Sequence, residues 1–262
     1  MIKTQEPAVA GLFYPADATQ LRQQVRGFLN AAKGGQVTAP KALIAPHAGY
    51  IYSGPVAANA YAQLAGVAEQ VRRVVVLAPA HRMPFMGIAY NSAQRFRTPL
   101  GEIEVDREAL ERIADLPQVR LLDTAFRNEH SIEVHLPFLQ ETLGAFKLVP
   151  LLVGEADPAE VEQVIERLWG GDETLIVISS DLSHYLDYDS ARRMDGYTTE
   201  AIERLTPEAI SFQHACGRTP VNGLLLAAKR HHLHATTLDL RNSGDTAGPR
   251  NQVVGYGAYA FS

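Results

Sequence analysis

The chain has 262 residues, of which 46% are hydrophobic and 20% are charged, a composition typical of a globular protein with a sizeable core. Its formal net charge of -5 argues against a nucleic-acid partner, because phosphate binding requires a dense face of Lys and Arg that this sequence lacks. A single cysteine precludes an intrachain disulfide, and no apolar run has the length of a signal-peptide core or a membrane span. We therefore expect a soluble, cytoplasmic protein without a membrane contact.

Short β-branched apolar runs alternate with longer segments of helical periodicity along the chain. In chain order the patterns predict a helix at Ala18–Ala32, a strand at Ala42–Ala45, a helix at Val56–Leu64, a strand at Arg73–Ala78, helices at Arg107–Ala114 and Ile132–Leu143, a strand at Leu148–Val153, a helix at Pro158–Leu168, a strand at Thr174–Ser179, helices at Ala191–Arg204 and Val221–Lys229, and closing strands at Thr236–Leu240 and Val253–Phe261. Uninterrupted apolar strands such as VVVLA and LIVIS are typical of a parallel sheet that helices cover on both faces. The sequence therefore predicts an α/β protein, a single-domain α/β/α sandwich over residues 1–262 with a mostly parallel central sheet.

Polar residues follow three of these strands at the point where each strand ends. KALIA is followed after one proline by His47, RRVVVLA is followed by Pro-Ala-His81, and LIVISS is followed by Asp181 and, three residues on, His184. The carboxyl ends of parallel strands share one edge of a sheet, and ligands bind in the crevice there. One such histidine is more often structural than functional, but three at equivalent topological positions indicate a common site.

The single Cys216 is the candidate thiol for this site. It lies in HACGRTPVNGLLLAAK, where Gly and Pro introduce an amphipathic helix, so we expect the helix N-terminus to lower its pKa. The alternative is an inert, buried cysteine that packs as a small hydrophobe. Together with His47 and His81, a Cys216 thiolate would form a set that proteins use for zinc, copper and iron. His214, two residues before Cys216, is a competing ligand.

The segment NEHSIEVH does not fit the metalloprotease pattern that its composition suggests. The H-E-x-x-H motif needs two histidines four positions apart, whereas His130 and His135 are five apart. A helix start with acidic residues in its first turn is the better interpretation, and Glu129 and His130 are candidates for supporting the metal ligands. The Ser53-Gly54-Pro55 segment is predicted to start a helix, but without a P-loop lysine it gives no support for nucleotide binding.

Several long and unusual motifs occur in one order along nearly the whole chain: GLFYPAD, APHAGYIYSGPVAA, APAHR, FRTPLG, NEHSIEVHLPF, LLVG, SSDLSHY, ACGRTPVNGLLLA and VGYGAYAF. In these motifs the sequence resembles the Memo family, including its prokaryotic AmmeMemoRadiSam system protein B members. The resemblance implies a fold similar to the class III extradiol dioxygenases, which are non-haem iron enzymes that open catechol rings.

The resemblance also implies roles for individual residues. The family pocket contains two His and one Cys, which correspond to His47, His81 and Cys216 here, as ligands of one transition-metal ion. The dioxygenases hold Fe(II) with two His and a carboxylate, so the thiol is a departure that shifts metal preference, and we expect iron or copper, with zinc as an alternative.

Four further residues of this sequence match pocket positions. His184, at the position of the dioxygenase acid/base histidine, and Asp181 are the expected catalytic residues. Phe13 and Tyr50 are the expected substrate-binding aromatics, and Phe13 stands where animal Memo has Trp.

Three functions remain open at this stage. The first is a metal-binding redox protein, a dioxygenase-like oxidoreductase acting on an unknown small molecule. The second is a non-catalytic module that binds an anionic, phosphopeptide-like segment or a protein partner, and the third is an intracellular copper- or iron-handling protein. By resemblance to bacterial members, AMMECR1-like and radical-SAM proteins are the expected partners.

Overall fold

This computed structural model describes residues 2–262 of the chain. The strands are β1 (Thr4–Gln5), β2 (Ala42–Ala45), β3 (Arg73–Pro79), β4 (Ile88–Tyr90), β5 (Arg95–Thr98), β6 (Gly101–Glu104), β7 (Val119–Leu121), β8 (Lys147–Val153), β9 (Thr174–Ser179), β10 (His184–Leu186), β11 (Ala235–Asn242) and β12 (Val253–Phe261). The helices are α1 (Ala18–Ala31), α2 (Tyr50–Tyr61), α3 (Arg107–Glu111), α4 (Leu136–Thr142), α5 (Pro158–Leu168), α6 (Tyr188–Glu203) and α7 (Arg218–Arg230).

Within the described residues, nine strands form one mixed sheet in the order β10-β12-β2-β9-β3-β8-β4-β7, with β11 also paired to β12. The four strands β2, β9, β3 and β8 are parallel, and their residues are almost all buried apolar side chains. The predicted parallel sheet is therefore correct for this centre. It is wrong for the flanks, where β12 runs antiparallel to β2 and β4 antiparallel to β8. On one flank β11 also runs antiparallel to β12, because the two form a hairpin, whereas a parallel pair needs a long crossover.

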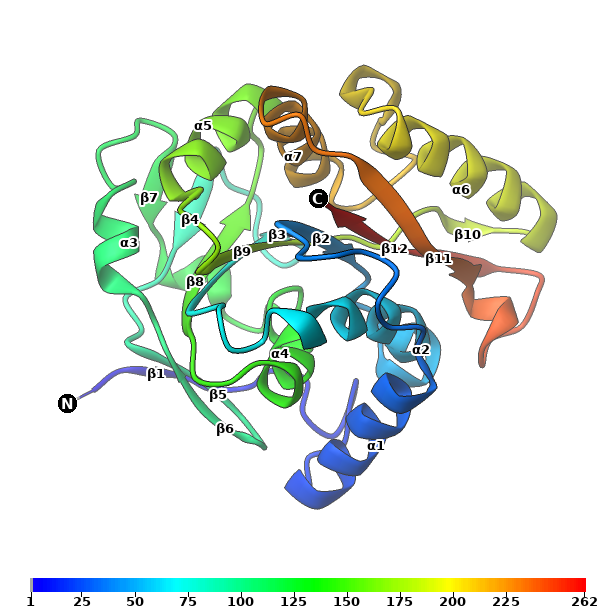
Figure 1. Cartoon of the computed structure of the whole chain (residues 1–262), viewed down its shortest axis with the longest axis horizontal. Helices are drawn as coiled ribbons and strands as arrows, with labels where there is room; N and C mark the ends of the chain where they lie inside the picture. Colours follow the sequence, from blue (N-terminus) through cyan, green and yellow to red (C-terminus); the bar gives the residue numbers. More distant parts are fainter. Residues whose placement is uncertain (1) are drawn as a thin grey trace.

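Helices flank this sheet, as the sequence predicts. Figure 1 shows α5, α6 and α7 on one side of the sheet and α1, α2 and α4 on the other. The helix α7 packs on β3, β9 and α5, whereas α2 packs on β2, β11 and β12. On α5 the buried side chains Val161, Val164, Ile165 and Leu168 form the stripe that a helix facing a core requires. No helix within residues 2–262 combines the length and apolar character needed to cross a membrane.

Two predicted helices differ from those observed. The helix α2 begins at Tyr50 instead of Val56 and contains Pro55, and the N–H of Ser53 donates to the carbonyl of Gly49. The predicted helix 132–143 is a 3-10 turn, Glu133–His135, followed by α4. The strands β1, β4, β5, β6, β7 and β10 were not predicted, because segments of two to four residues are too short to show a period.

A buried carboxylate holds the N-terminal segment against the core. Glu133 accepts hydrogen bonds from the backbone N–H of Ala8 and Val9 and from the hydroxyl of Tyr14. The segment between these contacts includes Phe13, whose carbonyl accepts a bond of 2.8 Å from the N–H of Tyr50 at the start of α2. Residues far apart in the sequence are thereby joined beside the carboxyl end of β2.

Candidate metal site

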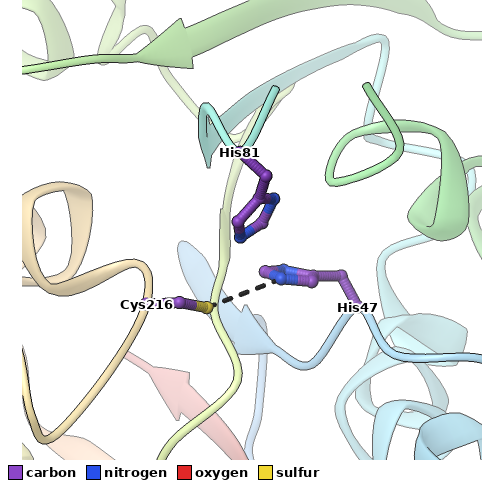
Figure 2. Close-up of side chains that lie close together, drawn as sticks. All are labelled: His47, His81 and Cys216. Carbon is purple, nitrogen blue, oxygen red and sulfur yellow. Dashed lines mark hydrogen bonds between the residues drawn. The ribbon is translucent and has the colours of Figure 1, made fainter. Parts of the chain in front are cut away.

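The carboxyl ends of β2, β3 and β9 meet at one edge of the sheet, since Ala45 is in register with Ser179 and Leu77 with Ile178. The loops that follow bring His47 and His81 to the segment that precedes α7. One ligand atom each from His47, His81 and Cys216 lie within 4.8 Å of one another. Figure 2 shows these three side chains, which come from three separate segments, pointing toward a common centre.

The carboxylate of Glu129 orients His81. Its Oε2 accepts the backbone N–H of His81 at 2.6 Å, and its Oε1 lies 3.2 Å from Nδ1 of the same ring. Burial opposes ionisation of Glu129, but bonds from the His81 ring and backbone and from Ser131 N–H outweigh it and hold the pKa at about 2. An ionised carboxylate can only accept, so Nδ1 of His81 carries the proton. The lone pair of His81 is then on Nε2, and is available to a metal.

A serine performs the same task for His47. Nδ1 of His47 lies 2.6 Å from the hydroxyl of Ser179, which itself lies 2.7 Å from the carbonyl of Ser131. A carbonyl cannot donate, so the single Ser179 proton goes to Ser131, and His47 Nδ1–H donates to Ser179. Burial, followed by the neighbouring His81 and His130 rings, lowers the pKa of His47 well below its usual value. His47 is therefore a neutral imidazole with its Nε2 lone pair free.

The ring of His130 packs against both His47 and His81, and Phe13 packs against His130. The His130 ring stacks on His81, with centroids 5.1 Å apart, and contacts His47 edge-on at 5.6 Å. Phe13 in turn contacts the His130 ring edge-on, with centroids 4.8 Å apart. Burial lowers the pKa of His130 to about 4, so this ring is also neutral. The ligand rings thus sit among uncharged rings and cannot rotate freely.

The thiol of Cys216 lies 3.5 Å from Nε2 of His47 and accepts the backbone N–H of Asp181 at 3.3 Å. The next residue must be glycine, because a Cβ at position 217 would lie 2.4 Å from the carbonyl of Ser179. This close approach of the pre-α7 segment to the end of β9 brings the sulfur to the histidines.

The predicted lowering of the Cys216 pKa is wrong. Burial, and secondly the charge of Asp181, raise the pKa of this thiol to about 12. The helix α7 begins only at Arg218, and these two effects outweigh its N-terminus. Without a metal, the thiol is therefore protonated.

The predicted acid/base residues lie beside this group. Asp181 is buried, accepts the backbone N–H of His47 at 2.8 Å and has its second oxygen 3.9 Å from Nε2 of His47. Burial raises its pKa to about 7. His184 begins β10 with an exposed side chain, and partial desolvation and the neighbouring His81 lower its pKa.

Other predicted site residues have different environments. Tyr50 is 1% exposed, donates its hydroxyl to the Val134 carbonyl and packs on Phe138, so its contact with substrate stays a prediction. Its burial follows from its place in the first turn of α2, facing α4. His214 bonds to Ser211 and is not among the residues that converge. The sequence analysis missed Ser131 and Ser179, since serine at a strand end carries no distinguishing pattern.

Comparisons with known proteins agree with the motif order of the chain. Residues 5–260 match the sequence model of a family described as "Memo-like protein". A "MEMO1 family protein" of Aquifex aeolicus (strain VF5) is 37% identical over 267 residues, which cover 97% of this chain and 98% of the relative. A "MEMO1 family protein" of Sulfolobus acidocaldarius is 33% identical, with the same two coverages. Among solved structures, the uncharacterized protein JW3007 from Escherichia coli K12 matches with a TM-score of 0.49 and 12% identity, covering 82% of this chain and 98% of that chain.

The raised thiol pKa predicts slow alkylation of the metal-free protein. Iodoacetamide reacts with the thiolate, so its rate with chelator-treated protein should still be rising above pH 9, past the value of about 8.5 for a free cysteine. Mass spectrometry of Cys216 over a pH series measures this rate, with urea-unfolded protein as the control. A rate that already levels off near pH 7 would contradict the buried, protonated thiol.

Proposed function

The chain belongs to the Memo-like protein family, and we propose that it is a metal-binding redox protein that holds one transition-metal ion through His47, His81 and Cys216. The observation that carries the proposal is the convergence of three donor atoms within 4.8 Å, with Nδ1 of both rings already engaged. The donor set fits such an ion, since neutral imidazoles and a soft sulfur are ligands that copper, iron and zinc accept. We favour iron or copper, with zinc as the alternative.

A bound iron or copper ion would supply one-electron redox chemistry, which no side chain of this site provides. The chain itself supplies the ligands and their orientation. Binding requires the Cys216 thiol to lose its proton. The apparent metal affinity should therefore rise with pH.

We assign His184 and Asp181 to proton transfer. The Asp181 carboxyl has a pKa of about 7, so it exists in both protonated and ionised forms near neutral pH. His184 has an exposed ring beside the site and can exchange protons with solvent. These two groups flank the ligands, as acid/base catalysis on a bound substrate requires. Phe13 is the aromatic surface that we assign to substrate contact, because it packs on His130 at the site.

The proposal includes a relationship to the class III extradiol dioxygenases, in which a carboxylate stands where this chain has Cys216. It does not include ring cleavage, because function follows from the site rather than from the fold. We also propose a cytoplasmic location, where a reducing environment preserves the thiol, and AMMECR1-like and radical-SAM proteins as partners.

Removing either histidine should weaken metal binding. His47→Ala and His81→Ala should each lower the affinity for Fe(II), Cu(I) or Zn(II) by at least ~10-fold, since each removes one of three ligands. Anaerobic titration calorimetry measures the affinity, and circular dichroism checks that the variants fold. The control is His234→Ala, an exposed histidine that precedes β11 at the opposite edge of the sheet. If both site variants bind like the parent, the metal proposal fails.

The acid/base role of His184 should separate from metal binding. In copper-loaded protein with ascorbate as the reductant, His184→Gln should lower the rate of oxygen consumption by about 10²-fold, because a positioned proton donor is lost. Copper affinity should stay at the parental value. His214→Gln, a histidine close to Cys216 in sequence but held by Ser211, should change neither quantity. Loss of copper together with activity would instead make His184 a ligand.

A further inference from the structure

A cleft of about 990 Å³ opens beside the metal site on the side of Cys216. Its walls are the loop after β3, the loop after β8 and the segment that leads into α7. Pro79 and Cys216 belong to both the cleft wall and the surroundings of the site. The volume lies at the upper end of the roughly 300–1,000 Å³ of small-molecule sites, so the cleft can hold more than a single-ring substrate.

Flexible apolar side chains line much of this cleft. Met83, Phe85, Met86 and Phe212 all contribute to the wall. Met86 is 61% exposed and Phe212 is 75% exposed, which is unusual for side chains of this size on a solvated surface. Methionine adapts its shape to different partners, and such surfaces are typical of peptide-binding grooves.

The polar groups of the same walls are mostly acceptors. Glu155 and Asp157 are exposed carboxylates in the loop after β8. Opposite them Asn222, 7% exposed, donates from Nδ2 to the carbonyl of Ile210 at 3.0 Å, which fixes the orientation of its amide. Its buried Oδ1 has no hydrogen-bond partner among the described residues. A buried acceptor without a donor is costly, so a ligand N–H at this position would be stabilised.

The wall carries one arginine, Arg218, against the three carboxylates of Glu155, Asp157 and Glu160. Arg218 lies over the ring of Phe212, 5.5 Å from its centroid, and its guanidinium is close to Thr219. The cleft therefore combines apolar surface with a net negative charge and one buried amide oxygen that has no hydrogen-bond partner among the described residues. Its charge matches a basic occupant and opposes an anionic one.

We propose that this cleft binds an extended segment of a partner polypeptide that carries both basic and apolar side chains. Lysine or arginine pairs with Glu155, backbone N–H groups donate to Asn222, and apolar side chains cover Met86 and Phe212. An extended backbone supplies N–H donors and alternating side chains along its length, which a compact small molecule does not. Because Cys216 lines the cleft, a segment bound there lies at the metal site, but its binding does not require the metal.

The test uses two fluorescein-labelled ten-residue peptides in anisotropy titrations against the whole protein. One contains four lysines, three leucines and three glycines, and the other has glutamate in place of each lysine. The lysine peptide should bind at least ~10-fold more tightly, and Glu155→Arg should remove most of that difference. Glu69→Arg is the matched control, because Glu69 is an exposed glutamate before β3, at the amino edge of the sheet, and should leave both affinities unchanged.

Two further variants separate the parts of the proposal. Phe212→Ser removes an exposed ring, so the variant should still fold. It should lower the affinity for the lysine peptide, while the preference for the lysine peptide over the glutamate peptide should remain. His47→Ala should keep peptide affinity even if it loses metal, which distinguishes failure of the cleft from failure of the metal site. Equal binding of both peptides, or equal effects of Glu155→Arg and Glu69→Arg, would overturn the proposal. Displacement of the lysine peptide by equimolar spermine would also overturn it, in favour of a small polycation.

Discussion

The hydrogen bonds of the 129–131 turn hold both candidate histidine ligands, His47 and His81, and the rest of the site depends on them. The Glu129 carboxylate accepts hydrogen bonds from the backbone N–H and the ring of His81. The Ser131 carbonyl accepts the Ser179 hydroxyl proton, and the Ser179 oxygen accepts the ring N–H of His47. All these groups except His81 are buried, where an unmade hydrogen bond costs about 1–3 kcal/mol. The arrangement is therefore rigid, and it directs two lone pairs at one point before any ion is bound.

The same burial sets the chemistry of the third ligand. A protein interior disfavours charge, so it keeps the His47 imidazole neutral, keeps the Cys216 thiol protonated and brings the Asp181 pKa to about 7. When a cation replaces the thiol proton, the cation is attracted by the Cys216 thiolate and by the nearby Asp181 carboxylate. Such a site favours a bound cation over an empty site, but it is only weakly selective among metals. This is why the donor set favours a class of metals rather than one element.

Much of the site could be predicted because it follows from topology. Continuous apolar strands predict a parallel centre, and parallel strands place whatever follows them, here His47, His81 and Asp181, at one edge. The antiparallel flanks could not be predicted, since hydrophobic runs give no strand direction. The environments of Tyr50 and Cys216 could not be predicted either. The burial of Tyr50 depends on how α2 packs, and that of Cys216 depends on the contact of Gly217 with β9. No local pattern records such contacts.

X-ray absorption spectroscopy of the metal-loaded protein tests the central claim most directly, because it counts ligand atoms around the ion. For the zinc form, the structure predicts one sulfur at about 2.3 Å and two imidazole nitrogens at about 2.0–2.1 Å, with the remaining position taken by a light atom. The same sulfur contribution should be present in the iron or copper form. A shell of nitrogen and oxygen alone would contradict the claim, because it would leave Cys216 outside the metal site.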